Sequence, residues 1–465
     1  MRQLRFELAG GFEREELEEI HAGALRLLEE TGIACAHRGV HEALSGTPGI
    51  SIGGGRIKFA RELVERYVAK LRAEGKRARP PERFTLGGPW IAMWLCDPQS
   101  NSPREATAED CARMVKLCDA LNLGPGTAPV VASDAPLPLR AIHTDRLCLL
   151  HSRELGGGLG VRNEVELELE KEMWAAAGRK FPLVVQFLVS PLKFDETCMD
   201  LILRCLGDPQ VALYPALAIP MLGATAPLDV AGAAMQAAAE ALAAYITLDI
   251  ISHGALHAFS LRVEPFDFKY GTIVYGSPEF CLLGLLAEQL HQFYCGAPSY
   301  LCRLRTCAKV VGPQSCAERM ACAVVRGLAG ARHFDGVGQL SVDEVFSPVQ
   351  AILDVEIVRY VERVVQGMPG GEARAGLEAV QRVGPAGQFL DDELTLGRYA
   401  EMFWQPELFL HWNIGQWMRH GRPDILREAA ARAERIIAEH TFELPEQARR
   451  AVDKVYKKAQ QLLCS

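Results

Sequence analysis

The first part of the chain combines one clear helical pattern with short mixed runs. Over residues 12–31 apolar side chains recur every three or four positions, which predicts an amphipathic helix that ends at Gly32. Residues 33–100 contain shorter apolar runs divided by turns, and a hairpin is expected near residues 84–96. We therefore predict a helical and mixed N-terminal extension over residues 1–122.

After Leu123 short apolar runs alternate with helical segments. Strands are expected at residues 129–133, 157–161, 183–189, 211–215, 256–260, 299–303 and 331–335. Repeated strand–helix units imply parallel strands with right-handed crossovers. The pattern predicts a TIM (β/α)8 barrel over residues 123–392, with its eighth strand near Gly387–Leu390. C-terminal helices over residues 393–465 are expected to pack on this barrel.

In such a barrel, catalytic and binding residues lie in the loops that follow the strands. Aromatic side chains cluster around the strand expected at 256–260, at Phe259, Phe266, Phe268 and Tyr270. Aromatic faces attract quaternary ammonium groups, each contact contributing about 0.5–2 kcal/mol. The group is therefore a candidate cation-binding site, and ordinary packing is the alternative.

Charged side chains accompany the next two expected strands. Arg303 and Arg305 alternate with an apolar residue, so both can face one side and bind a carboxylate. His333 and Asp335 have the same spacing and can form an acid–base pair. A surface ion pair and a buried polar pair are the respective alternatives. Gln186, near the end of an earlier strand, is a further candidate for substrate binding.

Composition and charge exclude several classes of protein. Of the 465 residues, 49% are hydrophobic and 23% charged, and the net charge of −8 indicates no basic nucleic-acid-binding surface. The longest apolar stretch, residues 230–251, contains Glu240 and Asp249, which favours a buried helix over a membrane span. The first residues lack a signal-type apolar run, so a cytoplasmic location is expected.

Known metal-binding and nucleotide-binding patterns are missing from the sequence. The 14 cysteines include no CxxC pair, and the spacing of Cys302, Cys307, Cys316 and Cys322 matches no zinc module. We therefore predict no metal site and reduced, mostly buried thiols. Gly156–Gly160 departs from GxGxxG, and no P-loop, HExxH or GxSxG motif occurs.

Several segments resemble the corrinoid-dependent trimethylamine methyltransferase family, in the family's order and over nearly the whole chain. They are Ile20–Ile33, Ser190–Asp195, Pro220–Pro227, Tyr275–Glu279, Phe346–Pro348 with Asp354–Ile357, and Gly384–Leu390. The resemblance implies a TIM barrel that moves a methyl group from a methylamine to the Co(I) of a separate corrinoid protein. It also implies that Met221, Gly223 and Thr225 contact this corrinoid.

Departures from the family's pattern refine this interpretation. The founding members carry a pyrrolysine in the loop after the sixth strand, where this chain has standard residues, Ala308–Gly312. The chain thus resembles the non-pyrrolysine branch, whose characterised members demethylate quaternary amines such as glycine betaine or proline betaine. In the C-terminal motif, Gln388, Leu394 and Arg398 stand where the family usually has histidines. Gln388 is predicted to contact the substrate.

The predicted function is methyl transfer from a quaternary amine or methylamine to the Co(I) of a corrinoid protein, which carries the cobalamin-type cofactor. Phe268 and Tyr270 replace a Met and a Thr of the family's pattern and are expected to set donor choice. The chain itself is expected to form a homo-oligomer. A non-catalytic barrel that binds a methylated ligand or the corrinoid partner is the main alternative. Demethylation of an O- or S-methyl donor is a lesser one.

Overall fold

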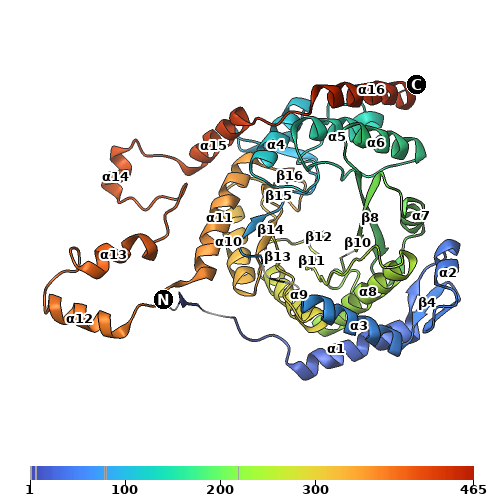
Figure 1. Ribbon diagram of the computed structural model, residues 1–465, viewed down its shortest axis with the longest axis horizontal. Coiled ribbons are helices and arrows are strands. Elements are labelled where there is room, and N and C mark those ends of the chain that lie inside the picture. The colour runs from blue at the N-terminus through green and yellow to red at the C-terminus, as the bar shows by residue number, and fades with distance from the viewer. Residues whose placement is uncertain (1–2, 6–7, 78, 80, 218, 465) are drawn as a thin grey trace.

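Strands in the centre of the molecule are surrounded by helices (Figure 1). The computed structural model describes residues 3–5, 8–77, 79, 81–217 and 219–464. The inner strands are β5 (Thr85–Leu86), β8 (Phe181–Val189), β10 (Val211–Leu217), β13 (Leu301–Arg303) and β14 (His333–Asp335). The surrounding helices are α4 (Ala108–Ala120), α5 (Arg140–His151), α6 (Glu164–Ala176), α7 (Glu196–Cys205), α8 (Val230–Ile251), α9 (Pro278–Cys295), α10 (Pro313–Leu328) and α11 (Pro348–Gln366).

The inner strands run parallel in two hydrogen-bonded groups. β8 pairs with β10 in one group, and β14 lies between β13 and β5 in the other. Single parallel bridges join Ala92 to Val130, Gly126 to Leu155, and Met221 to Glu264. Within the described residues these groups do not join into one closed sheet. The structure therefore establishes a mixed α/β architecture with parallel inner strands.

Four predicted strands are confirmed, as β8, β10, β13 and β14. Residues 129–133 carry a single bridge, and residues 157–161 and 256–260 form no strand. The hairpin expected at 84–96 is wrong, because Thr85–Leu86 pairs in parallel with β14. The hairpin in this region is formed instead by β6 (Trp94–Asp97) and β7 (Ser102–Glu105).

The eighth strand expected near Gly387–Leu390 is also wrong. These residues form an exposed turn between α12 (Ala373–Val383) and α13 (Glu393–Met402), with no strand beside them in the described chain. The place next to β14 is taken by β5, which comes from the segment before residue 122. The N-terminal segment thus supplies one of the inner strands.

The amphipathic helix expected at residues 12–31 is confirmed. It consists of α1 (Arg14–Arg26) and a π-helical turn at Leu27–Thr31, and Gly32 ends it with a φ of +72°. The other N-terminal elements are β1 (Gln3–Leu4), β2 (Ile33–Ala34), α2 (Arg38–Leu44), β3 (Ile50–Gly53), β4 (Arg56–Phe59) and α3 (Arg61–Gly75). β2 bonds to β9 (Lys193–Phe194), so this unit extends the sheet that contains β8.

The long apolar helix expected at residues 230–251 is α8, which lies inside the protein. It is the one described helix long and apolar enough to cross a membrane, and 83% of its most apolar window is buried. Alanine predominates in α8, and its small side chains let α1, α2 and α3 pack closely on it. The prediction of a buried helix is confirmed.

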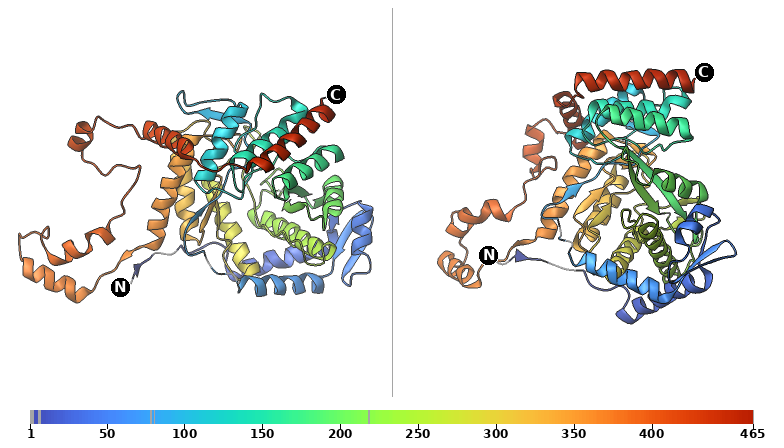
Figure 2. Two further views of the ribbon diagram at one scale, coloured as in Figure 1. Left: turned by 45° about the horizontal axis from the view of Figure 1, so that its top comes forward. Right: turned by 45° about the vertical axis from the view of Figure 1, so that its right-hand side comes forward.

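A segment after α11 projects from the body of the molecule (Figures 1 and 2). We call residues 370–424 the arm; it contains α12, α13 and α14 (Ile414–Arg419). At its base β17 (Met368–Pro369) pairs antiparallel with β1. The chain then returns to the body through α15 (Ile425–Glu439), which packs on α11 and α4, and α16 (Glu446–Leu463), which packs on α5 and α6.

Candidate functional site

A cavity of about 440 Å³ lies among the inner strands. Its wall includes Gly87, Gly88, Gly126, Gly156, Ala212 and Ala216. In an ordinary (β/α)8 barrel this interior is filled by layers of branched side chains. Glycine in the loops beside the inner strands and alanine on β10 leave the space open.

His333 and Asp335 lie on the cavity wall, and the intervening Phe334 points into the hydrophobic core. The two side chains therefore share one side of β14, as the alternation predicted. The two side chains do not bond to each other. His333 Nδ1 lies 2.9 Å from Thr85 Oγ1, and no hydrogen bond between His333 and Asp335 occurs in the described structure. Their predicted action as an acid–base pair stays a prediction.

The carboxylate of Asp335 is only partly matched by other charges. Its Oδ2 lies 3.9 Å from Arg303 Nε, which is beyond hydrogen-bond distance. Its Oδ1 is buried without a hydrogen-bond partner among the described residues. Because a buried, unpartnered acceptor is unfavourable, the Asp335 carboxylate favours a positively charged neighbour.

Two aromatic side chains on the cavity wall were not found by the sequence reasoning. They are Trp90 and Tyr214, both partly exposed to solvent. Tyr214 lies between Ala212 and Ala216 along the same face of β10, and this spacing was a readable signal. Trp90 was missed because it was assigned to a hairpin. The wall also carries Glu154, Arg179 and Lys180, so its charges are mixed. The part formed by Trp90, Tyr214 and Asp335 combines aromatic faces with a carboxylate, which suits a quaternary ammonium group.

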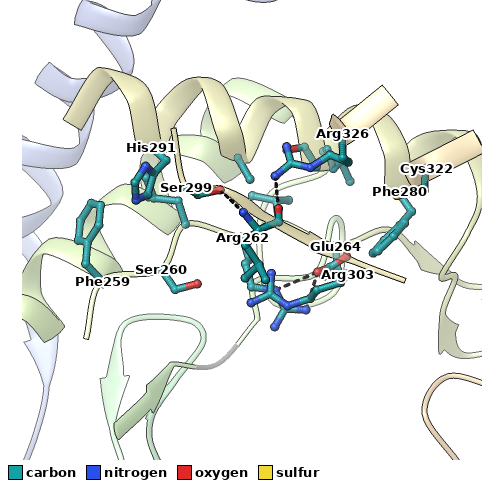
Figure 3. Close-up of a pocket in the computed structure, with 16 residues that line it drawn as sticks. Phe259, Ser260, Arg262, Glu264, Phe280, His291, Ser299, Arg303, Cys322 and Arg326 are labelled. Carbon is teal, nitrogen blue, oxygen red and sulfur yellow. Dashed lines mark hydrogen bonds and ion pairs between the residues drawn. The ribbon is translucent and has the colours of Figure 1, made fainter. Parts of the chain in front are cut away.

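Arginine side chains lie next to this cavity. Arg303 and Arg262 both line a second cavity of about 190 Å³, between residues 259–264 and α9. Figure 3 shows them beside Glu264, which accepts a hydrogen bond of 2.8 Å from Arg262. Burial, together with the charge of Arg262, lowers the pKa of Arg303 to about 10. Arg303 thus stays cationic near neutral pH, and its Nε lies 3.9 Å from Oδ2 of Asp335, which lines the first cavity.

Arg305 is not brought to either cavity. It is almost fully buried, donates hydrogen bonds to Gln339 and Asp343, and lies 6.0 Å from the centre of the Tyr275 ring. Burial raises the pKa of Asp343. Arg305 thus ties β13 to the loop around β15 (Gln339–Leu340), and of the two predicted arginines only Arg303 lines a cavity.

The predicted aromatic cage is divided in the structure. Phe266 and Phe268 contact each other with ring centres 5.3 Å apart, whereas Phe259 packs with Tyr245 and Tyr294 beside the second cavity. Phe266 belongs to β11 (Phe266–Asp267), which forms a hairpin with β12 (Thr272–Ile273). Tyr270 is 70% exposed at the tip of this hairpin. The four rings do not enclose a common space.

The turn that contains Met221, Gly223 and Thr225 lies against this hairpin. Gly223 has a φ of +77°, and a Cβ added to it would lie 2.8 Å from Cζ of Phe268. Thr225 Oγ1 accepts a hydrogen bond from the backbone N–H of Met221, which closes the turn. Gly223 and the 64% exposed Phe268 form part of an apolar rim that also includes Leu228.

A buried carboxylate joins this turn to the loop after β8. Glu240 on α8 accepts hydrogen bonds from Ser190 Oγ at 2.7 Å and from the backbone N–H of Leu192 at 2.9 Å. Gln236 donates to both Glu240 and the carbonyl of Thr225. Burial raises the pKa of Glu240. This network fixes two loops that follow neighbouring strands.

The two glutamines predicted to bind the substrate lie in different parts of the structure. Gln186 is exposed on β8, opposite Ala216 of β10. Gln388 is exposed on the arm, which projects away from the inner strands (Figure 1). The structure therefore does not bring Gln388 to the other candidate residues of the same chain.

The cysteines form no metal-binding group. No set of three or more His, Cys, Asp or Glu side chains suited to a metal ion occurs within residues 3–464 apart from the undescribed positions. Cys302 and Cys322 are buried, and burial raises the pKa of Cys307 and Cys316. The thiols of Cys307 and Cys316 therefore favour their protonated form.

Comparison with known proteins identifies the family. Residues 5–462 match the family described as trimethylamine methyltransferase (MTTB). The chain belongs to this family. The MTTB family assignment confirms the resemblance deduced from the sequence and makes the protein an enzyme of methyl transfer.

Two relatives and one solved structure align with most of the chain. The trimethylamine methyltransferase MttB of Desulfitobacterium hafniense (strain DSM 10664 / DCB-2) is 25% identical, over 94% of this chain and 91% of its own length. The glycine betaine methyltransferase of Desulfitobacterium hafniense (strain Y51) is also 25% identical, over 92% of both chains. The monomethylamine methyltransferase MtmB of Methanosarcina barkeri has a TM-score of 0.42 and 14% identity, over 97% of this chain and 88% of its own.

Proposed function

We propose that the protein transfers a methyl group from a small quaternary amine, bound in the cavity among the inner strands, to the Co(I) of a separate corrinoid protein. The observation that carries this proposal is the open cavity walled by Trp90, Tyr214 and the incompletely paired Asp335. We further propose that the inner strands form a (β/α)8-type barrel completed by β5, and that the protein acts in the cytoplasm.

In this proposal the donor's ammonium group lies against Tyr214 and Trp90, close to the charge of Asp335. A carboxylate on the donor, as in a betaine, pairs with Arg303, which remains cationic at neutral pH. The chain thereby holds both ends of a zwitterion. Trimethylamine lacks the second anchor, so a betaine-like donor is favoured.

The chemistry requires little acid or base from the protein. The methyl C–N bond breaks with its electron pair left on nitrogen, so a quaternary donor departs as a neutral amine and needs no proton. Co(I) supplies the electron pair of the new bond. The protein's contribution is to orient the methyl group and exclude water.

The rim residues fit a large, flat, mostly apolar acceptor. Phe268, Tyr270 and Leu228 are all at least 64% exposed, and the small residues of the 221–225 turn leave a shallow surface beside them. We infer that the corrinoid partner docks on this rim, with Met221, Gly223 and Thr225 next to it. Donor choice is then shared between the cavity and Phe268.

The test is methylation of a reduced corrinoid protein in the presence of glycine betaine, carnitine or trimethylamine, followed by the absorbance change from Co(I) to methyl-Co(III). We expect transfer from a betaine-like donor. Ligand-induced thermal stabilisation without transfer from any donor would instead favour a non-catalytic binding protein. Comparing Tyr214→Leu with Tyr270→Leu locates the cation: loss of donor affinity in the first variant places it in the cavity, and loss only in the second places it at the hairpin.

A further inference from the structure

The inner face of the strands is open to solvent along its length. On β8 the side chains on the cavity side are at least partly exposed: Pro182, Val184 and Gln186. The side chains that alternate with them are 0–3% exposed and belong to the hydrophobic core: Leu183, Val185 and Phe187. In a packed (β/α)8 barrel both faces are covered, because branched side chains fill the interior. In β8 only the face that packs on the helices is covered.

The cavity extends from the first to the last residues of the strands. Pro182 and Ala212 are paired near the N-terminal ends of β8 and β10, and Ala216 lies near the C-terminal end of β10. Tyr214, halfway between the two alanines, is 52% exposed, so solvent reaches the middle of the strands. The space is therefore a channel along the strands, with two ends.

The N-terminal end of this channel lies at the protein surface. Its wall includes Glu154 and Lys180, both exposed to solvent, and Lys180 directly precedes β8. Arg179 lines the same end. We call these three residues the N-terminal opening. The turn at residues 221–225, which forms part of the rim, follows β10 and lies beyond the opposite end of the strands.

Charges of both signs surround the N-terminal opening. The guanidinium of Arg179 is held in place, because it donates hydrogen bonds of 3.4 and 3.1 Å to the carbonyls of Ser152 and Leu155. Glu154 adds a carboxylate and Lys180 an ammonium group. An opening with charges of one sign repels ions of that sign, whereas mixed charges admit a molecule that carries both.

A run of glycines forms the channel wall beside this opening from backbone alone. Gly156, Gly157 and Gly158 have φ values of +135°, +75° and +104°. A Cβ added to any of them would lie 2.7–2.8 Å from a neighbouring atom. A larger residue is thus disfavoured both by backbone conformation and by space. This glycine-rich segment, which departs from a nucleotide-binding motif, serves the channel instead.

We propose that the methyl donor enters, and the demethylated amine leaves, through the N-terminal opening. This inference rests on the proposed function, in which the corrinoid partner docks on the rim at the other end of the strands. A docked partner covers that end, so a small molecule needs a second route to the cavity. The N-terminal opening supplies this route, and its mixed charges suit a betaine, which carries one charge of each sign.

The route is tested by modifying an introduced cysteine with a methanethiosulfonate reagent that carries a trimethylammonium group. The thiolate forms a mixed disulfide and releases methanesulfinate, and mass spectrometry of the modified peptide distinguishes it from the native cysteines. Ala212→Cys probes the N-terminal half of the channel. Val185→Cys is the matched control, since Val185 is 3% exposed on the opposite face of β8. We expect Ala212→Cys to react about a hundredfold faster, because the control thiol is reached only by local unfolding.

A second substitution separates the two ends of the channel. Ala216→Trp places an indole on the same face of β10, near its C-terminal end. Added to Ala212→Cys, it should leave the modification rate unchanged if the reagent enters by the N-terminal opening. The proposal is overturned if Ala212→Cys reacts no faster than the control, or if the added tryptophan abolishes its modification.

Stopped-flow fluorescence with glycine betaine gives a second readout. Ala212→Trp narrows the route at a distance from the rim, so the association and dissociation rate constants should fall together while Kd changes little. A loss of affinity without slower dissociation would place residue 212 in the binding site and contradict the route. If labelling fails while methyl transfer occurs, only the route is wrong. If no donor is demethylated, the proposed function is wrong, and the route for a donor falls with it.

Discussion

Replacing Asp335 with asparagine tests how the cavity recognises charge. The substitution keeps the shape of the side chain and removes its negative charge. Two unit charges about 5 Å apart attract by about 3 kcal/mol at an effective dielectric constant of about 20. Arg303 Nε, 3.9 Å from Asp335 Oδ2, already offsets part of this charge. We therefore expect a net loss of about 1.5 kcal/mol, or roughly tenfold in the dissociation constant of a quaternary ammonium donor.

Calorimetric titration with two ligands of the same shape makes the measurement specific. Glycine betaine carries the ammonium group, and 3,3-dimethylbutanoate has carbon in place of the charged nitrogen. The Asp335→Asn variant should bind glycine betaine about tenfold more weakly and 3,3-dimethylbutanoate with nearly unchanged affinity. Equal losses for both ligands would mean that the variant distorts the cavity, and no loss for either would refute the role of Asp335 in charge recognition.

Three further substitutions test the surroundings of the site. Gly223→Ala should lower the free energy of unfolding in urea by about 1–2 kcal/mol and displace Phe268, because φ is +77° and the new Cβ lies 2.8 Å from that ring. Gly54→Ala is the control: its φ is +59° but its Cβ meets open space, so the free energy of unfolding should fall by less. Arg319→Met should cost about 3–5 kcal/mol, because it leaves a fully buried carboxylate unpaired, and a smaller loss would contradict this. Burial lowers the pKa of His151 to about 4, so the unfolding free energy should fall as pH drops from about 6.5 to 4. Because burial also lowers the pKa of His143, His151→Phe should reduce this slope without abolishing it.

The sequence was sufficient where apolar patterns are local. Buried parallel strands appear as short apolar runs, which is why β8, β10, β13 and β14 were predicted within two or three residues. Ser-Pro pairs predict helix starts at Ser190, Ser277 and Ser347. Ser277 and Ser347 do accept hydrogen bonds from the backbone N–H groups of Phe280 and Gln350 at the start of α9 and α11, whereas after Ser190 the helix begins only at Glu196, behind Asp195. Local patterns also predicted that His333 and Asp335 face one side.

The sequence was insufficient where partners lie far apart along the chain. Thr85–Leu86 is a weak local pattern and becomes a strand only because β14 supplies its hydrogen bonds. The cavity could not be anticipated either, since it is lined by glycines and alanines from segments that lie far apart in the sequence. Phe259 and Tyr270 share a loop region in sequence, but the chain path separates them, one into the core and one to a hairpin tip.

The pairing of β5 with β14 has a consequence for how the chain acquires its structure during synthesis. Thr85 and His333, which are hydrogen-bonded in the finished protein, are 248 residues apart. Residues 85–86 leave the ribosome long before β14 does, so they stay unpaired until His333–Asp335 has been synthesised. Such distant contacts slow folding and prolong the exposure of strand edges. A fragment that starts after residue 122 should consequently aggregate, whereas adding residues 1–122 as a separate chain should restore solubility.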